Sequence, residues 1–146
     1  MKLLVFLIVL VAALQAYVRL APTDAARWHV DPDSAPDPGQ GGKRTSVELD
    51  MQTYTVWSRL TKAIEGEPRS RLIAGGPGSG MATWEVRSTV WGFPDYVTAK
   101  VTPSGGGARL VILSRLRFGK GDMGVNAKRV ARILMAIDTP INKGDG

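Results

Sequence analysis

The stretch SRLRFGKGDMGVNAKRV, residues 114–130, predicts how the C-terminal part of the chain folds. In its first five residues, Ser114, Leu116 and Phe118 alternate with Arg115 and Arg117, which is the pattern of a half-buried β-strand. Gly119 and Gly121 then interrupt the strand, and Asp122 is placed to accept backbone N–H groups at the start of a helix. We therefore expect a strand, a glycine corner and a basic helix that runs to about residue 137. The apolar stripe of that helix would consist of Val130, Ile133, Leu134 and Ile137.

Upstream of this stretch, hydrophobic periodicity predicts another helix and three more strands. The helix covers residues 50–64, with Asp50 as its N-cap and an apolar stripe formed by Met51, Tyr54, Trp57, Leu60 and Ile64. The four strands cover residues 69–75, 81–91, 96–102 and 109–118, and turn sequences separate them. This order predicts an α+β domain over residues 50–138, a four-stranded antiparallel sheet with both helices packed on one face. Residues 139–146 are expected to form a frayed tail.

The first 20 residues form a targeting or membrane segment, because Lys2 precedes a nearly continuous apolar run that Arg19 closes. As a helix, residues 3–18 would span about 24 Å, short of the roughly 30 Å hydrocarbon core of a bilayer. The segment fits an uncleaved signal anchor with its N-terminus inside, which we favour, or a signal peptide cleaved after Ala16. The first alternative predicts a single-pass inner (cytoplasmic) membrane protein whose C-terminal domain is periplasmic or extracellular. The second predicts a protein secreted to the periplasm.

Residues 21–49 are rich in proline and glycine and are acidic overall, so we expect a tether or a strap across the domain surface. Trp28, His29 and Val30 are an exception within it. A tryptophan in a linker is costly to expose, and this short apolar group is expected to dock onto the domain. We interpret His29, which is close to Asp31, as a surface or strap residue rather than half of a catalytic pair.

Composition excludes several kinds of site. The chain has no cysteine and one histidine, so we expect neither a thiolate or multi-histidine metal site nor a disulfide, and we predict no cofactor. The formal net charge is +6, and residues 100–132 hold eight cations against Asp122 alone. Such a basic patch suits an anionic partner, although a solvated surface that only keeps the protein soluble has the same composition.

Two strings, TWEVRSTVWGFPDYV (residues 83–97) and SRLRFGKGDMGVNAKRV (residues 114–130), resemble the domain of unknown function 1499 family. Members of this family are small envelope-associated bacterial proteins, and the resemblance covers about the C-terminal two-thirds of the chain. The N-terminal apolar segment also fits the family. The resemblance implies a fold and a location, and it implies no activity, because none is established for the family.

Charged and amide side chains in these two strings form the candidate site. The candidate residues are Arg87, Asp95, Arg115, Arg117, Asp122 and Asn126. Adjacent antiparallel strands would bring several of them to one end of the sheet, where Arg87 or Arg115 could hold a carboxylate or phosphate in bidentate fashion. The structural alternative is that these arginines pair with Asp95 or Asp122, while Asn126 ties the corner to the first helical turn.

The favoured function is therefore a membrane-anchored extracytoplasmic domain that binds an anionic or lipidic ligand or a protein partner, or that serves a structural role. An envelope enzyme with Asp95 or Asp122 as general acid or base is an alternative. The sequence favours it less, because it has no close carboxylate pair and no nucleophile motif. A nucleic-acid-binding domain is a second alternative, and an export segment would separate it from its partner.

Overall fold

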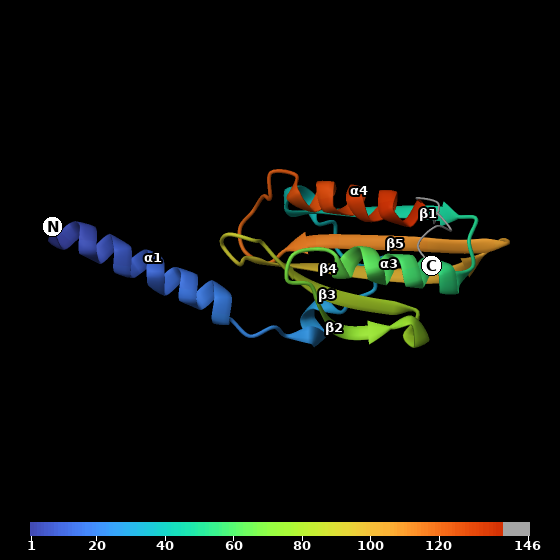
Figure 1. Cartoon of the computed structure of the whole chain (residues 1–146), viewed down its shortest axis with the longest axis horizontal. Helices are drawn as coiled ribbons and strands as arrows, with labels where there is room; N and C mark the ends of the chain where they lie inside the picture. The colour runs from blue at the N-terminus through green and yellow to red at the C-terminus, as the bar shows by residue number, and fades with distance from the viewer. Residues whose placement is uncertain (139–146) are drawn as a thin grey trace, which may run out of the picture.

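The computed structural model describes residues 1–138, which form an α+β domain with a long N-terminal helix (Figure 1). The helices are α1 (Lys2–Leu20), α2 (Ala25–Trp28), α3 (Thr53–Glu65) and α4 (Val125–Asp138), with 3-10 turns η1 (Gly39–Gly41) and η2 (Pro77–Ser79). The strands are β1 (Gly42–Leu49), β2 (Arg71–Gly76), β3 (Met81–Arg87), β4 (Pro94–Ser104) and β5 (Gly107–Leu116). The predicted tail, residues 139–146, lies outside the described residues.

The sheet is antiparallel and has five strands in the order β1-β5-β4-β3-β2, so the prediction of four strands is wrong. The missing strand is β1, which pairs with β5 along its whole length and lies in the region predicted to be a tether or strap. Its sequence, GKRTSVEL, has few large apolar residues because β1 is an edge strand. Charged side chains on an edge discourage pairing with other chains, and they also weaken the hydrophobic signal of a strand.

The main core lies between one face of the sheet and the helices α3 and α4 (Figure 1). The apolar stripe predicted for α4 faces this core, with Val130, Ile133 and Ile137 buried and Leu134 partly buried. In α3 the buried stripe consists of Val56, Trp57, Leu60 and Ile64.

Two details of the prediction for α3 are wrong. Tyr54 was expected in the core but is 80% exposed, because it lies roughly 100° around the helix from the centre of the buried stripe. Asp50 was expected to be the N-cap, but the helix begins only at Thr53 and Gln52 precedes it without a side-chain capping bond. The Asp122 prediction is confirmed, because this carboxylate accepts the backbone N–H groups of Gly124 and Asn126.

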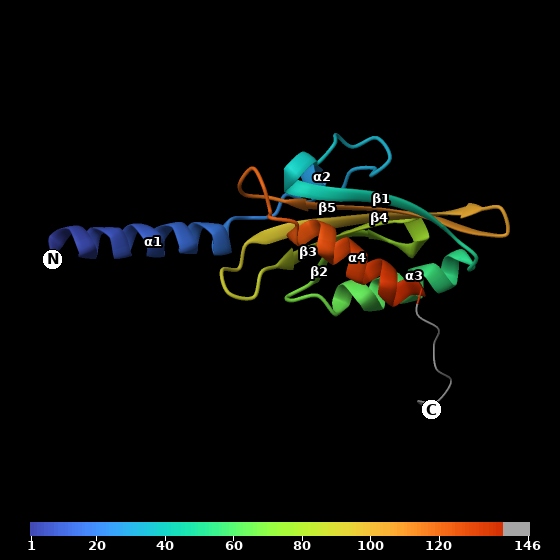
Figure 2. The same cartoon turned by 90° about the horizontal axis from the view of Figure 1, so that it is seen from above.

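The opposite face of the sheet is covered by residues 21–41, which we call the docked segment (Figure 2). Trp28 stacks on Tyr96 of β4, with ring centroids 4.1 Å apart and planes inclined by 18°. His29 Nδ1 lies 2.9 Å from the hydroxyl of Thr83 on β3. Ion pairs from Lys100 to Asp31 and Asp33, at 2.6 and 3.0 Å, hold the next part of the segment. The sheet is therefore covered on both faces.

Helix α1 projects from one end of the domain, and most of its residues are exposed (Figures 1 and 2). Its 19 residues are long and apolar enough to cross a membrane, and a signal sequence would share these properties. Only Val18 among them is buried, where the last turn of the helix meets the domain. The loops that connect β3 to β4 and β5 to α4 lie at this same end (Figure 1).

Candidate functional site

The six predicted site residues lie at one end of the sheet but on two different faces. In the β4 register, Asp95 pairs with Leu116 and Tyr96 pairs with Arg115, while Arg87 lies opposite Pro94. Because neighbouring residues of a strand point to opposite faces, this register separates the carboxylates from the arginines. The helix-covered face holds Asp95, Asp122 and Asn126, and the face under the docked segment holds Arg87, Arg115 and Arg117.

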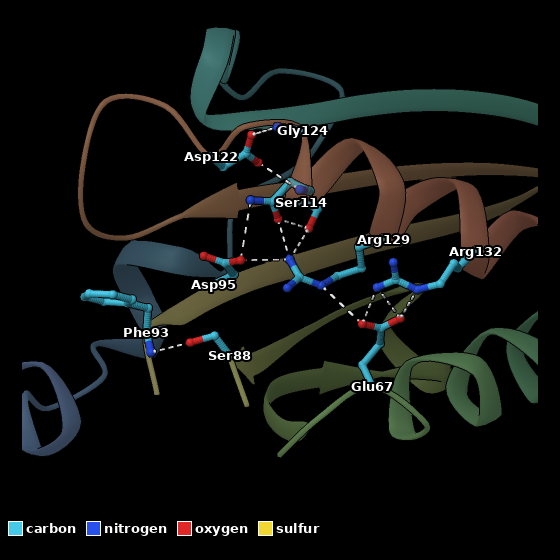
Figure 3. A network of polar contacts seen from close by, with 10 residues as sticks. Glu67, Ser88, Phe93, Asp95, Ser114, Asp122, Gly124, Arg129 and Arg132 are labelled. Carbon is cyan, nitrogen blue, oxygen red and sulfur yellow. Dashed lines mark hydrogen bonds and ion pairs between the residues drawn. The ribbon is translucent and has the colours of Figure 1, made fainter. Parts of the chain in front are cut away.

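The first group belongs to a buried polar network between β4, β5 and the start of α4 (Figure 3). Arg129 is its centre, with Nη1 2.9 Å from Asp95 Oδ2, 2.6 Å from Asn126 Oδ1 and 3.4 Å from Ser114 Oγ. The hydroxyl of Ser114 also donates to Asn126 Oδ1, and Asn126 Nδ2 donates to Asp95 Oδ2 at 3.5 Å. Ser114 and Asn126 are completely buried and Arg129 is 4% exposed. These contacts join the last two strands to α4.

Arg129 was predicted only as a member of the basic patch and not as a site residue. Its spacing from Asn126 and Ile133 places it beside the apolar stripe of α4, and this spacing could have indicated that Arg129 is buried. Its second partner, Glu67, follows α3 and lies 3.4 Å from Arg129 Nε in an ion pair. Glu67 also accepts two bonds from Arg132 Nη2 at 2.9 and 3.1 Å (Figure 3). Nothing in the local sequence around Glu67 indicates this pairing across the fold.

Asp122 and Asp95 have opposite electrostatic environments. Burial alone would raise the pKa of Asp122, but bonds from the Asn126 and Gly124 N–H groups, both 2.8 Å long, outweigh it and the pKa is lowered. The pKa of Asp95 is raised, because the loss of solvent on burial exceeds the opposing effect of the Arg129 guanidinium. Asp122 is therefore the better anion of the two.

These bonds occupy the carboxylates that were the candidates for acid–base chemistry. Both oxygens of Asp122 accept backbone N–H groups at the start of α4, and Asp95 Oδ2 accepts from Asn126 and Arg129. Asp122 borders a shallow pocket of about 520 Å³, together with Met123 and glycines of the corner and of residues 39–42. The structural alternative had Arg87 or Arg115 pair with one of these carboxylates, but Asp95 pairs with Arg129 instead, and Asp122 is held by backbone N–H groups.

On the other face, Glu85 is the centre of a second network and is 2% exposed. Its carboxylate accepts from Arg87 Nε at 2.8 Å, from the hydroxyl of Thr23 in the docked segment, and from Tyr96 at 3.5 Å. Burial alone would raise the pKa of Glu85, but the bonds from Thr23 and Arg87 lower it below its usual value. Glu85 thus remains a buried anion that links the docked segment to β3.

The three arginines of this face bind the chain that crosses it. Arg87 Nη1 donates to the carbonyl of Val18 at 3.4 Å, and Arg117 Nη1 donates to the carbonyl of Ala21 at 3.5 Å. Arg115 Nη2 donates to the carbonyl of Trp28 at 2.7 Å, and its guanidinium lies 5.2 Å from the centre of that indole ring. Burial lowers the pKa of Arg115. In this structure the carbonyl groups of Val18, Ala21 and Trp28 accept the guanidinium hydrogen bonds that an external anion would otherwise accept.

The basic patch of residues 100–132 is largely compensated within the chain. Four of its eight cations form ion pairs: Lys100, Arg109, Arg129 and Arg132. Two more, Arg115 and Arg117, donate to carbonyl groups of the docked segment. Lys120 and Lys128 remain as exposed cations. A continuous cationic surface of the kind that binds nucleic acid is therefore not formed by these eight residues.

An open groove of about 680 Å³ runs along α3 on the helix-covered side. Tyr54 and Trp57 of α3 line it together with Val101 of β4 and two prolines, Pro77 and Pro103. Lys62 and Glu65 add one charge of each sign. Most of its exposed lining is apolar, and the groove is open to solvent. Within residues 1–138 no three His, Cys, Asp or Glu side chains are grouped so that they could hold a metal ion.

Fold and site together define a small α+β protein with an apolar N-terminal helix and two buried polar networks. The chain belongs to the family described as "Protein of unknown function (DUF1499)", whose model matches residues 22–137. This confirms the family resemblance predicted from residues 83–97 and 114–130. No curated protein matches the chain.

Several solved structures have a related arrangement at low similarity. Protein MLL2253 from Mesorhizobium loti is 12% identical with a TM-score of 0.47, and the match covers 65% of this chain and 93% of that one. Protein CV1439 from Chromobacterium violaceum is 12% identical with a TM-score of 0.40, covering 66% and 94%. Protein Ms6760 from Mycobacterium smegmatis is 14% identical with a TM-score of 0.38, covering 70% and 91%. Similarity at this level supports no statement about function.

Proposed function

We propose that this protein is a single-pass membrane protein whose α+β domain lies outside the cytoplasm and binds an anionic, lipid-like ligand in the groove along α3. The observation that carries the membrane part is α1, a 19-residue apolar helix that stays exposed in the folded chain. An apolar surface of this length is unfavourable in water, and insertion into a bilayer removes it. A retained anchor is favoured over a cleaved signal peptide because the end of α1 is part of the domain packing.

Fractionation of the expressed full chain tests this part. We expect the protein to stay in the membrane pellet after alkaline carbonate extraction, with an intact mass that includes residues 1–20. A soluble protein whose mass begins after Ala16 would contradict the anchor and support secretion instead.

The groove along α3 carries the binding part of the proposal. Tyr54, Pro77 and Pro103 offer exposed apolar surface for a hydrocarbon chain above the buried Trp57, and Lys62 offers a cation for a carboxylate or phosphate. The predicted arginines suit an external anion less well, because they already bind carbonyl groups of the chain. A lipid-like anion is therefore the ligand class that suits the apolar lining and can pair with the ammonium group of Lys62, although Glu65 adds the opposite charge.

Ligand binding is testable by nuclear magnetic resonance on the full chain in phosphatidylcholine nanodiscs. Added oleate should shift the indole N–H resonance of Trp57, assigned by its loss in Trp57→Phe, and Lys62→Gln should weaken the titration about fivefold. The matched control is Lys128→Gln, which removes an exposed lysine of α4 outside the groove. An unmoved Trp57 resonance, or equal titrations of the two lysine variants, would contradict the proposed site.

A further inference from the structure

The domain is joined to α1 without a flexible linker. Val18, in the last turn of the helix, is 2% exposed, and Ala21, the residue after the helix, is 8% exposed. Their carbonyl groups accept from Arg87 at the end of β3 and from Arg117 just after β5, at 3.4 and 3.5 Å. If α1 spans a bilayer, as proposed above, the end of the domain next to α1 must therefore lie at the membrane surface.

Two loops of the domain contact the last turns of α1. The ring of Tyr17 meets Phe118, at the start of the β5–α4 loop, edge to face with centroids 6.1 Å apart. Arg19 Nη2 donates to the carbonyl of Val90, in the loop between β3 and β4, at 3.2 Å. The β3–β4 loop, residues 88–93, thus projects at the end of the domain from which α1 departs (Figure 1).

The β3–β4 loop exposes three apolar side chains. Val90 is 71% exposed, Trp91 54% and Phe93 39%. Scattered apolar residues are common on protein surfaces, but these three belong to one short loop beside an apolar helix. Tryptophan is enriched where membrane proteins cross the headgroup region, since its ring is apolar and its N–H group is polar. The composition of the loop therefore suits the edge of a bilayer.

Two exposed arginines flank this loop. A side chain at Gly92 would meet Arg19 Cγ at 3.3 Å and Arg69 Nη1 at 3.5 Å, so the two arginines approach the loop at the same glycine. Arg69 Nη2 also donates to the carbonyl of Thr89 at 2.9 Å. Within residues 1–138 neither arginine forms an ion pair with a carboxylate. Their charge is available to lipid phosphates, which arginine binds well.

The length of α1 places these groups at a suitable depth. A helix of 19 residues is roughly 28 Å long, close to the roughly 30 Å of a hydrocarbon core. A spanning α1 would have Arg19 at the boundary between hydrocarbon and headgroups, where arginine side chains extend toward the phosphates. The β3–β4 loop, which is bonded to Arg19, would lie at the same level.

We propose that this end of the domain is a membrane-docking surface for anionic bilayers. Val90, Trp91 and Phe93 enter the headgroup region, while Arg19 and Arg69 bind phosphate groups of anionic lipids. The inference rests on the proposed anchoring of α1 and adds to it a fixed orientation of the domain. In this orientation the hairpin between β4 and β5, at the opposite end of the sheet, points away from the membrane (Figure 1).

Tryptophan quenching tests the docking surface. The full chain is reconstituted into vesicles of phosphatidylcholine and phosphatidylglycerol, with or without phosphatidylcholine brominated near the top of its acyl chains. Trp57 and Trp84 are buried and Trp28 is stacked on Tyr96, so brominated lipid should quench the emission of Trp91 most strongly. We expect Trp91→Phe to abolish most of this quenching. Emission that does not respond to brominated lipid would overturn the proposal.

A matched variant and a lipid series complete the experiment. Gly106→Trp in the Trp91→Phe background moves the reporter to the β4–β5 hairpin, where an added side chain meets open space, and it should restore no quenching. The docked population is the fraction of chains whose β3–β4 loop lies in the bilayer, as reported by quenching of Trp91. Arg69→Gln should reduce this population about fivefold in vesicles that contain phosphatidylglycerol and leave it unchanged in pure phosphatidylcholine. Equal quenching at positions 91 and 106 would contradict the proposed orientation. No effect of Arg69→Gln on the docked population would contradict the proposed role of this arginine.

Flotation of the same vesicles separates the two proposals. A chain that floats with the vesicles while Trp91 is not quenched retains the anchor and loses the docking surface. A chain that does not float at all contradicts both the anchoring of α1 and the docking that rests on it.

Discussion

Single buried polar residues determine how the two ends of the sequence are held to the sheet. Arg129 and Glu85 are 4% and 2% exposed, and each is surrounded by partners from elements far apart in the sequence. A buried charge that loses one partner retains the cost of its desolvation, so removal of a partner is more damaging than the value of one bond suggests. Both networks should therefore respond strongly to single substitutions.

Asn126→Ala should lower the free energy of unfolding by about 2–4 kcal/mol, because it removes the buried Oδ1 atom that accepts hydrogen bonds from both Ser114 and Arg129. Urea denaturation of the full chain in detergent would measure this loss. Arg132→Gln removes an arginine that is 57% exposed in its side chain and should cost less than about 1 kcal/mol. Equal losses of unfolding free energy in the two variants would show that the buried network stabilises the fold no more than an exposed ion pair does.

The pH dependence of stability should reveal Glu85. Its pKa is lower in the folded chain than the usual 4.5, so the folded chain binds fewer protons than the unfolded chain as the pH falls through this range. The stabilisation by Glu85 is present above the usual pKa and is lost as the pH falls toward the lowered one. Glu85→Gln should flatten the acid limb of unfolding free energy against pH, whereas the exposed Glu65→Gln should not. Parallel acid limbs in all three proteins would contradict this role of Glu85.

The docked segment makes the sheet a buried layer with helices on one side and residues 21–41 on the other (Figure 2). Its chief apolar contact is Trp28, stacked at 4.1 Å on Tyr96 and placed under the guanidinium of Arg115. Tyr96, on which this tryptophan stacks, is completely buried. The docked segment therefore contributes to the stability of the domain as a structural layer.

Trp28→Ala should release the docked segment and lower the free energy of unfolding by about 2–3 kcal/mol. Hydrogen–deuterium exchange should become faster in residues 21–41 and in β4, while exchange in α3 and α4 stays slow. Ser34→Ala, an exposed position of the same segment, is the control and should change neither quantity. Unchanged exchange in Trp28→Ala would mean that the ion pairs of Asp31 and Asp33 hold the segment on their own.

The sequence predicted the elements whose periodicity is strong and missed those that depend on distant partners. The stripe of α4 and the cap at Asp122 could be read locally, since both depend on neighbours within a few turns. Edge strand β1 could not, because its charged side chains lack an apolar pattern. Because the strands are adjacent, we predicted that the candidate residues lie at one end of the sheet. Their division between the two faces depends on the register of β4, and the sequence does not define that register.

Exposed apolar surface and two arginines are concentrated at one end of the molecule. The apolar helix α1, the exposed β3–β4 loop and two arginines without carboxylate partners in residues 1–138 gather at one end. Of the eight cations in residues 100–132, four pair with acids of the docked segment or with Glu67 and Asp95. The net charge of +6 therefore says less about a partner than the position of the individual cations in the fold.

The most direct test of this account is the side of the membrane on which the domain lies. The chain has no cysteine, so Gly106→Cys places a single thiol on the β4–β5 hairpin, where a side chain has open space. We predict that a membrane-impermeant maleimide labels this thiol in intact spheroplasts, and that the labelled chain remains in the carbonate-washed membrane pellet at its full mass. Labelling only after lysis, with a cytoplasmic protein as the leak control, would contradict the proposed extracytoplasmic domain.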